Sequence, residues 1–508
     1  MNTRNFTALA VLIAGLPLAI WLGVSIAQEQ VQTVAWIVGA LFLVTCLALG
    51  RHVWVLIPAS LGFKGMINLL PGGPEPWHLM TAVVGCFTLL RILSRRQKLS
   101  YHWTFMETAL LLVGLTILQA FVRNPTGLSI LGGELAGGKV YIMYGVAFVA
   151  VVLLGMADVD RRGIVWAALL LGAGTIVDGM IGTASQISQT FGLMVLPYYS
   201  GIDLQVAVTK DYTAALDESR LWYLGTIGGV LSLVACTYWR PLAALDLTKP
   251  WRALTAMCGV VASLLSGYRQ QIAYLMLNFL LGSIIRKKPL DAILVTGLGL
   301  VLVGGVAALV PPQMLPYAVQ RVFTVIPGYK TASSRAAVDA EGSMEGRFEM
   351  WREVLKGNKY IRNKTLGDGF GFSEKEQAMQ NAFQHGDERA RAAMTKVDMY
   401  LASGMLHGFH VETIRCTGAV GLVAATIALF AMMALALKQI RHFRRDGYGM
   451  IMGSAFFLAL PFLYKPFYYW LVYGSYQVEF PVLIATAGLL KILDRVRRNE
   501  LAASGREG

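Results

Sequence analysis

Apolar residues gather along the chain in runs of about 20, separated by short charged or Pro/Gly-rich patches. A helix of about 20 residues spans the hydrocarbon core of a bilayer, so each run predicts a membrane-crossing helix. We therefore expect an all-α, polytopic membrane protein of about 14 transmembrane helices. The expected spans are 6–26, 32–50, 52–70, 76–93, 103–122, 138–157, 163–183, 220–238, 251–267, 269–285, 289–310, 409–436, 448–466 and 470–492.

The composition leads to the same class of protein. Hydrophobic residues make up 56% of the chain and charged residues only 15%, against about 25% charged residues in ordinary soluble domains. This excludes a disordered protein, a coiled coil and a soluble enzyme. All five cysteines fall inside apolar runs, which indicates neither a disulfide framework nor a thiolate metal site.

The net charge of +14 reflects membrane topology. With the N-terminus in the cytoplasm and the spans alternating, 23 Lys and Arg residues fall on the inner side and six in the short outer loops. Short cytoplasmic loops are enriched in Lys and Arg in this way. We expect both termini in the cytoplasm, and we expect no nucleic-acid partner.

The spans divide the chain into four regions. Residues 311–408 form a large extracytoplasmic loop domain, and 311–406 carries 13 basic and 11 acidic residues, which is typical of a solvated segment. Phe348, Trp351 and Leu355 predict one apolar stripe of a short amphipathic helix, and a second helical stretch is expected over 373–401, so the domain should be mainly helical. The other regions are 1–219 (spans one to seven with an outer loop at 184–219), 220–310 (spans eight to eleven) and 409–508 (three spans and a cytoplasmic tail).

Two histidines lie where the large loop re-enters the membrane. His407 and His410 are three residues apart, so they share a face of a helix. A neutral imidazole at this place can accept a proton near neutral pH. The alternative is a pair of interfacial histidines that anchor a helix end.

Three arginines lie close to the expected hydrocarbon boundary. Arg220 begins a span, Arg269 lies in a short outer turn and Arg415 lies two turns into a span. Such an arginine normally faces a protein interior or an aqueous cavity, and its planar guanidinium suits a pyrophosphate group. The alternatives are snorkelling to the headgroups for Arg220 and an i, i+3 pair of Arg415 with Glu412.

Other chemistry is less well supported. The sequence has no HExxH motif and no Cys/His cluster, so we predict neither a metal site nor a cofactor. The aromatic run 464–470 is expected at an outer turn, where its default role is an interfacial aromatic belt. Sugar stacking is the alternative role for these rings.

Several short motifs occur in a characteristic order. His407 stands eleven residues before a G-x-x-G motif at 418–421. The preceding elements are Arg269 in its outer turn, R-x-x-x-W (Arg347 and Trp351) and G-x-G-x-G at 367–371 (Gly367 and Gly369). Over residues 220–425 this order resembles the O-antigen ligase and polysaccharide polymerase superfamily of bacterial membrane glycosyltransferases. The chain departs from that pattern in Gly408, which replaces the usual asparagine, in the second histidine His410, and in fourteen expected spans rather than about twelve.

The resemblance implies a GT-C-like fold and a metal-independent, inverting glycosyltransferase of the bacterial inner membrane. Its donor would be a glycan on undecaprenyl pyrophosphate, and its acceptor a sugar hydroxyl on a glycan or on a lipid-linked molecule at the outer face. Arg220 and Arg269 would bind the pyrophosphate, and His407 would act as the base. Other expected partners are membrane lipids and a flippase or chain-length regulator.

The residues leave alternatives to this function. Ligase and polymerase differ only in the acceptor, whose contacts are not readable from the sequence. A lipid-linked glycan flippase or other polysaccharide transporter would not need an outer domain of nearly a hundred residues, and the first seven spans carry few charges, with Lys64 and Asp178 the clearest cases. A scaffold protein would not need arginines and histidines gathered on one face.

Overall fold

The chain is described by a computed structural model in which the placed residues are 31–70, 72–96, 100–125, 138–200, 221–246, 248–324, 326, 328–331, 347–371, 406, 408–446, 449–471 and 473–504. These residues form helices and connecting turns, with one isolated antiparallel bridge between Ile67 and Tyr199. The chain divides into two compact units, Met1–Val53 and Trp54–Gly508.

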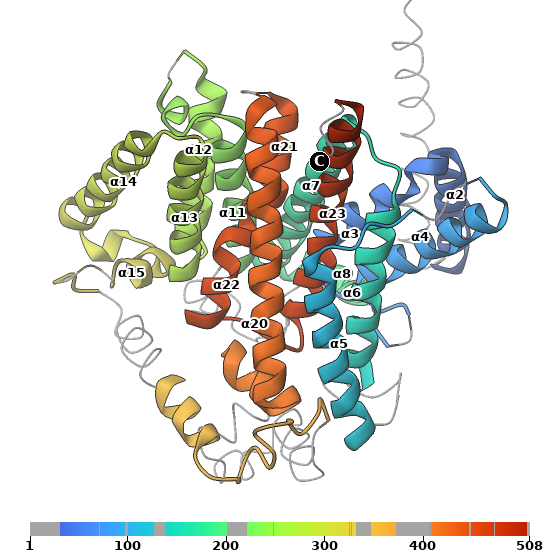
Figure 1. Ribbon diagram of the computed structural model, residues 1–508. Coiled ribbons are helices and arrows are strands. Elements are labelled where there is room, and N and C mark those ends of the chain that lie inside the picture. The colour runs from blue at the N-terminus through green and yellow to red at the C-terminus, as the bar shows by residue number, and fades with distance from the viewer. Residues whose placement is uncertain are drawn as a thin grey trace, which may run out of the picture. The chain divides into compact units, whose positions relative to one another are not determined.

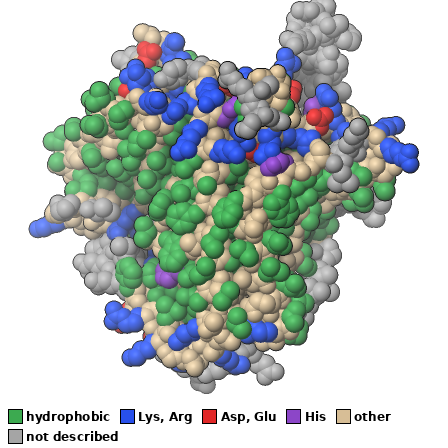
Figure 2. Space-filling view, in the orientation of Figure 1, with side chains coloured by type: hydrophobic (Ala, Val, Ile, Leu, Met, Phe, Trp, Pro, Cys, Tyr) green, Lys and Arg blue, Asp and Glu red, His purple; other side chains and the backbone are tan. Residues whose placement is uncertain are grey.

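Long apolar helices dominate the described residues, which confirms a multi-pass membrane protein. On the face shown in Figure 2, hydrophobic side chains cover the middle, and Lys and Arg gather toward both ends. Two shorter helices, Trp222–Tyr238 and Pro250–Leu265, are also apolar. Among the described residues, eight helical segments are long and apolar enough to cross a membrane: Gly39–Leu61, Pro76–Leu93, Phe105–Arg123, Gly138–Met156, Arg161–Ile187, Pro289–Leu309, Phe409–Asp446 and Met450–Leu471.

The predicted span 52–70 is wrong as a single helix. Helix α2 (Val31–Leu49) is followed along the chain by the 3-10 turn η1 (Gly50–Val55) and by α3 (Leu56–Leu61), which ends before Gly62. A Cβ atom at Gly62 would lie 2.4 Å from the backbone nitrogen of Thr175, so the chain turns away there against another helix.

The next helices follow the predicted spans closely. They are α4 (Pro76–Leu93), α5 (Phe105–Arg123), α6 (Gly138–Met156) and α7 (Arg161–Ile187), which continues four residues beyond its predicted end. The short helix α8 (Gln189–Val195) was not predicted, because it lies in the expected outer loop 184–219. Capping side chains fix two of their starts. Thr104 and Glu107 form a reciprocal capping box at α5, and the Asp160 carboxylate accepts a bond from Gly163 N at α7.

A group of helices in the middle of the chain packs through small residues. It comprises α11 (Trp222–Tyr238), η2 (Pro241–Leu245), α12 (Pro250–Leu265), α13 (Arg269–Ile285), α14 (Pro289–Leu309), η3 (Pro312–Met314) and α15 (Tyr317–Phe323). A Cβ atom at Gly228 would lie 2.8 Å from the carbonyl oxygen of Gly259, so α11 and α12 approach closely, as membrane helices do at small residues.

The C-terminal helices correct two predicted boundaries. They are α20 (Phe409–Phe443), η4 (Arg444–Asp446), α21 (Met450–Ala459), α22 (Pro461–Leu471) and α23 (Glu479–Ala503). The aromatic run 464–470 is not an outer turn, because α22 continues through it despite Pro466. The turn follows instead, and α23 begins at Glu479 rather than near 470.

The predicted inner loops lie together at one end of the second unit, which carries the C-terminus in Figure 1. Arg161 Nε lies 2.5 Å from a Glu500 carboxylate oxygen, and Lys491 Nζ donates to the carbonyl of His102 at 2.7 Å. We call this the basic end, and it comprises residues 100–107, 155–161, 442–446 and 491–504.

Several of the predicted outer segments lie together at the end of the bundle opposite the basic end (Figure 1). Arg123 Nη2 donates to the carbonyl of Gly367 at 2.6 Å, and Tyr476 N donates to Glu412 at 3.1 Å. We call this the loop end, and it comprises residues 119–125, 347–371, 406, 408–412 and 473–478. The grouping agrees with the predicted alternation, while the side of the membrane that each end faces stays a prediction.

The described parts of the predicted loop domain pack in two different places. Val319, Val322 and Phe323 of α15 pack against α12, α13 and α14 in one apolar cluster. Residues 347–371 pack instead against α5 and α20. The segments 332–346 and 372–405, which include the predicted helix 373–401, lie outside the described residues.

Candidate functional site

Residues 347–355 form a short helix, but its apolar stripe differs from the predicted one. Met350 and Val354 are buried in a cluster with Val411 of α20, whereas the Phe348 side chain is 55% exposed. The prediction that Phe348 shares the stripe is therefore wrong. The helix docks through positions 350 and 354, which are one turn apart, and this leaves Trp351 at the edge of the contact.

Trp351 of the R-x-x-x-W motif fixes the chain on both sides of position 407. Its Nε1 donates to the carbonyl of Leu406 at 2.9 Å. A Cβ atom at Gly408 would lie 2.7 Å from the indole ring, so this position has no room for a side chain. The glycine at position 408 is accounted for by this close approach. His407 itself lies outside the described residues.

His410 lies between two tryptophans at the start of α20. Its ring centroid is 4.6 Å from that of Trp351, in an edge-to-face arrangement, and 6.1 Å from that of Trp470, nearly parallel. Its Nδ1 is buried and has no hydrogen-bond partner among the described residues. The imidazole is thus held by aromatic contacts and keeps one ring nitrogen for a further interaction.

Helix α20 is broken at Gly418, which has φ 75° and ψ −176°. The break frees backbone groups that a continuous helix would pair internally. The loop 364–369 pairs them instead. Asp368 N and Gly369 N donate to the carbonyls of Arg415 and Cys416 at 2.7 and 2.9 Å, and Ala419 N donates to the carbonyl of Lys364 at 2.8 Å.

The two glycine motifs of the sequence meet at this break. A Cβ atom at Gly418 would lie 2.1 Å from the carbonyl oxygen of Thr365, and one at Gly367 would lie 2.4 Å from the nitrogen of Thr417. Gly367 and Gly369 also have positive φ, at 75° and 88°. The glycines of both motifs therefore permit close backbone approach.

Arg123 at the end of α5 is a residue whose role the sequence did not reveal. Its Nη2 donates to the carbonyls of Leu366 and Gly367 at 2.7 and 2.6 Å, and its Nε donates to Gln119 at 2.9 Å. Asn124 Nδ2 donates to the carbonyl of Asp368 at 2.9 Å. The only sequence signal was a basic residue in an outer loop, which does not indicate a partner about 240 residues away.

The predicted pyrophosphate residues do not form one described cluster. Arg269 Nη2 donates to the Thr324 hydroxyl at 2.5 Å, which ties the start of α13 to α15. Arg415 is only 4% exposed and lies five positions from His410, about 140° around the helix. Arg220 lies outside the described residues.

Helix α22 connects the neighbourhoods of Arg269 and His410. Tyr468 donates to Gln270, the residue after Arg269, at 2.8 Å, and Trp470 contacts His410. Burial raises the pKa of the nearby Tyr473, while the positive charge of Arg347 lowers it, so Arg347 also lies in this region. In contrast to an interfacial belt, most rings of the aromatic run are buried in the protein, and Phe467 and Trp470 are the exposed ones.

Glu412 has a structural role at the start of α20. Its buried carboxylate accepts hydrogen bonds from the Ser475 hydroxyl and from the nitrogens of Tyr476 and Gln477, at 3.0 to 3.1 Å. These bonds hold the α22–α23 turn against the start of α20. Tyr476 of this turn packs its ring against those of Phe370 and Phe409.

A second polar cluster was not identified from the sequence. The buried Asp178 carboxylate accepts bonds from the Tyr199 hydroxyl and from Lys64 N. Burial raises the pKa of Glu75 to about 7, although a bond from Trp77 and the charge of Lys139 lower it. Two acidic residues on separate elements, Asp178 on α7 and Glu75 at the start of α4, come together here. Hydropathy alone gives no sign of such a cluster.

At the loop end, His410 offers an imidazole nitrogen for proton transfer. The described arginines that were predicted to bind phosphate, Arg269 and Arg415, do not form one cluster with it. In the part of the chain that is described, no group of three or more His, Cys, Asp or Glu residues is placed to hold a metal ion. No protein-family description matches the chain, and no curated protein sequence is significantly similar to it.

Proposed function

We propose that this chain is a membrane glycosyltransferase that moves a glycan from an undecaprenyl-pyrophosphate donor to an acceptor sugar hydroxyl. The proposal includes about 14 spans, a GT-C-like fold and a loop end on the outer face of the bacterial inner membrane. The observation that supports it is the position of Trp351, which contacts Leu406, Gly408 and His410. Trp351 of the R-x-x-x-W motif thereby lies against described residues on both sides of position 407, more than fifty positions away in the sequence.

The proposed chemistry is an inverting displacement at the anomeric carbon. His407 takes the proton from the acceptor hydroxyl as its oxygen attacks that carbon, and the lipid pyrophosphate leaves from the opposite side. Arg220 and Arg269 stabilise the negative charge that develops on the pyrophosphate, because preorganised cations bind the transition state more strongly than the ground state. Arg415 is a further phosphate ligand in this proposal. The acceptor, either a lipid-linked core or another glycan, decides between ligase and polymerase.

In this proposal His410 orients the site rather than acting as the base. Its ring is fixed between Trp351 and Trp470, and its Nδ1 is buried, which suits a group that positions a substrate. Position 407 lies nearer the outer loop, where an acceptor sugar would arrive from water.

The test is to purify His407→Ala and His410→Ala and to measure transfer and donor binding separately. General-base catalysis contributes about 10²–10⁴-fold, so His407→Ala should lower turnover by that factor and leave donor binding intact. His410→Ala should have the smaller effect on turnover. If only His410→Ala abolishes transfer, the histidines are assigned in the wrong order. Full activity of both variants would reject the mechanism and favour a transporter.

A second test addresses the pyrophosphate. Arg269→Lys keeps the charge but loses the planar fork, so it should remove most transfer activity. Arg321→Lys is the matched control, because Arg321 lies in the same helix group and donates to the carbonyl of Gly267. Normal glycan product from Arg269→Lys would indicate that Arg269 only ties α13 to α15.

Two further experiments test the topology and the metal independence. Reporter fusions after Arg96 and after Lys364 should report opposite sides of the membrane, and the same side for both would reject the topology. The purified protein should transfer glycan from a lipid-linked donor in excess chelator. Activity that returns only with added magnesium or manganese would contradict this part of the proposal.

A further inference from the structure

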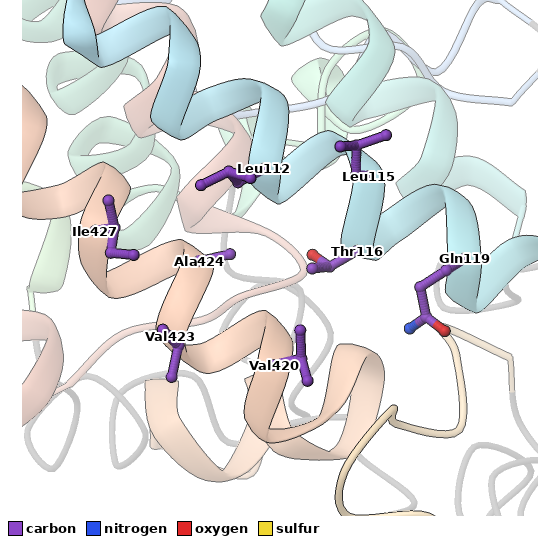
Figure 3. Close-up of a pocket in the computed structure, with 8 residues that line it drawn as sticks. All are labelled: Leu112, Leu115, Thr116, Gln119, Val420, Val423, Ala424 and Ile427. Atoms are coloured by element: carbon purple, nitrogen blue, oxygen red, sulfur yellow. The ribbon is translucent and has the colours of Figure 1, made fainter.

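A groove with a volume of about 380 Å³ opens on the surface between α5 and α20 (Figure 3). Its floor is formed by the buried Thr116 and Ala424. Its rims are exposed aliphatic side chains, Leu112 and Leu115 on α5 and Val420 and Val423 on α20. The groove exists because small side chains on the floor lie between larger ones on both rims.

The surroundings of this groove are hydrocarbon if the helices cross the membrane as their composition indicates. Both walls belong to segments that are long and apolar enough to do so, Phe105–Arg123 and Phe409–Asp446. Along most of its length the groove therefore accommodates a flexible apolar chain. A water-soluble ligand would find few polar partners there, because Thr116 and Gln119 are the polar residues of the lining.

The loop end of the groove is polar and basic. Gln119 lines the groove there and accepts a bond from Arg123, which is one turn further along α5. On the other wall, Ala419 N and Val420 N donate to the carbonyls of Lys364 and Thr365, so Lys364 lies beside the end of the α20 rim. The two walls thus end in one cationic residue each.

Asp368, an acidic residue of the same described loop, uses its carboxylate within that loop. The Asp368 carboxylate accepts bonds from the nitrogens of Arg362 and Asn363, at 2.7 and 3.0 Å, which directs it to its own loop. An apolar groove that ends in two cations matches an amphiphile with an apolar chain and an anionic head. Each basic residue near the membrane surface adds to the attraction of an anionic lipid.

We propose that this groove binds an anionic phospholipid of the surrounding membrane. One acyl chain lies between the rims, and the phosphodiester group contacts Arg123 and Lys364. The lipid would then cover the outer surface of α20 next to its break at Gly418. This site does not depend on the proposed transferase activity, because it is argued from the groove and its charges alone.

The test uses phosphatidylglycerol with a photoactivatable acyl chain, incorporated into phosphatidylcholine nanodiscs that hold the full chain. Labelling of the peptides around Leu115 and Val423 should saturate, and unlabelled phosphatidylglycerol should compete with it whereas phosphatidylcholine should not. Leu300 and Val301, exposed on α14, are the control surface, where labelling should rise without saturation. Equal and uncompeted labelling of both surfaces would overturn the proposal. Stronger competition by a polyprenyl phosphate than by phosphatidylglycerol would overturn the phospholipid assignment.

Two variants separate the groove from its charges. Ala424→Phe fills the floor and should remove the saturable labelling, whereas Val301→Phe on the control surface should leave it unchanged. Lys364→Gln keeps the backbone carbonyl that pairs with Ala419 and should weaken competition by phosphatidylglycerol about fivefold. If Ala424→Phe does not fold, Lys364→Gln decides. Unchanged competition in Lys364→Gln would reject the phosphodiester contact.

Discussion

The two ends of the helix bundle are held together by different interactions. At the basic end, buried charges pair across helices: Lys491 Nζ lies 2.5 Å from a Glu107 oxygen, and both side chains are almost fully buried. At the loop end, the principal contacts are backbone hydrogen bonds between loop 364–369 and the broken helix α20, together with aromatic rings.

This difference reflects which polar groups need partners at each end. The basic end carries the many cations of the predicted inner loops, and buried ones need carboxylate partners such as Glu107 and Asp494. The loop end has a helix break, so its orphan backbone groups need partners instead. Because the backbone supplies much of the support there, side chains such as His410 remain available for a substrate.

The largest effect is expected from Gly418→Val at the loop end. Its φ of 75° disfavours a side chain, and the added Cβ would overlap the carbonyl of Thr365. Because backbone strain and steric overlap act at the same position, we expect a loss of more than about 4 kcal/mol in stability or failure to fold. Losses of this size are exceptional among single substitutions. Thermal unfolding in detergent measures the loss.

The matched control for that substitution is Gly297→Val on α14. Nothing lies within 4 Å of a Cβ atom built at Gly297, so the melting temperature should change little. A Gly418→Val protein that melts like wild type would contradict the broken-helix geometry, and with it the role assigned to loop 364–369.

The next effect concerns the basic end. Lys491→Met removes one partner of a buried ion pair and leaves the Glu107 charge uncompensated. Breaking such a pair costs about 3–5 kcal/mol. Adding Glu107→Gln should recover part of the loss, whereas Lys249→Met, at an exposed position, should cost less than about 0.5 kcal/mol. A Lys491→Met loss no larger than the control's would show that this end does not depend on the pair.

Asp494 should make the basic end sensitive to acid. Burial alone would raise the pKa of Asp494, but hydrogen bonds from Arg497 and Arg498 outweigh it and hold the pKa at about 2. A carboxylate whose pKa is lower in the folded protein than in the unfolded chain stabilises the fold. This stabilisation is present when the pH is above the unfolded-state pKa of about 3.9, and it is lost as the pH falls toward the folded-state pKa.

The measurement compares the wild type with Asp494→Asn over a pH series. The stability difference should be roughly 2 kcal/mol near pH 6 and should vanish between about pH 4 and pH 2. A difference that stays constant down to pH 2 would rule out ionised Asp494 as its source. The loop end should not contribute to this difference, because its titratable groups are the same in both proteins.

Hydropathy predicted the helix bounds well where they depend only on the local sequence. The bounds of α4, α5, α6 and α13 lie within two residues of the expected spans, because length and apolar content are local properties. The predicted helix bounds were wrong where tertiary contacts determine the end of a helix. Helix α3 stops at Gly62, where the backbone of α7 approaches, a contact that no local pattern encodes.

The sequence singled out some residues that the structure brings together, but it did not show how they contact one another. The spacing identified Trp351, Gly367 and His410, and the structure brings Trp351 to His410 and Gly367 to the break in α20. The sequence could not show that Arg123 holds the glycine loop, because that contact joins elements 243 or more positions apart. A positive φ at Gly418 is likewise invisible in a run that reads as a continuous helix.

The smallest effect is expected from the surface pair at the basic end. Arg161 Nε and Glu500 lie 2.5 Å apart, but the arginine side chain is about half exposed, so solvent screens their attraction. A double-mutant cycle of Arg161→Ala and Glu500→Ala should give a coupling energy of about 0.2–1 kcal/mol that decreases with added salt. A coupling as large as that of Lys491 with Glu107 would mean that the whole basic end acts as one charge network, because burial would then no longer distinguish strong pairs from weak ones. A small coupling would instead restrict the electrostatic support of this end to its buried carboxylates.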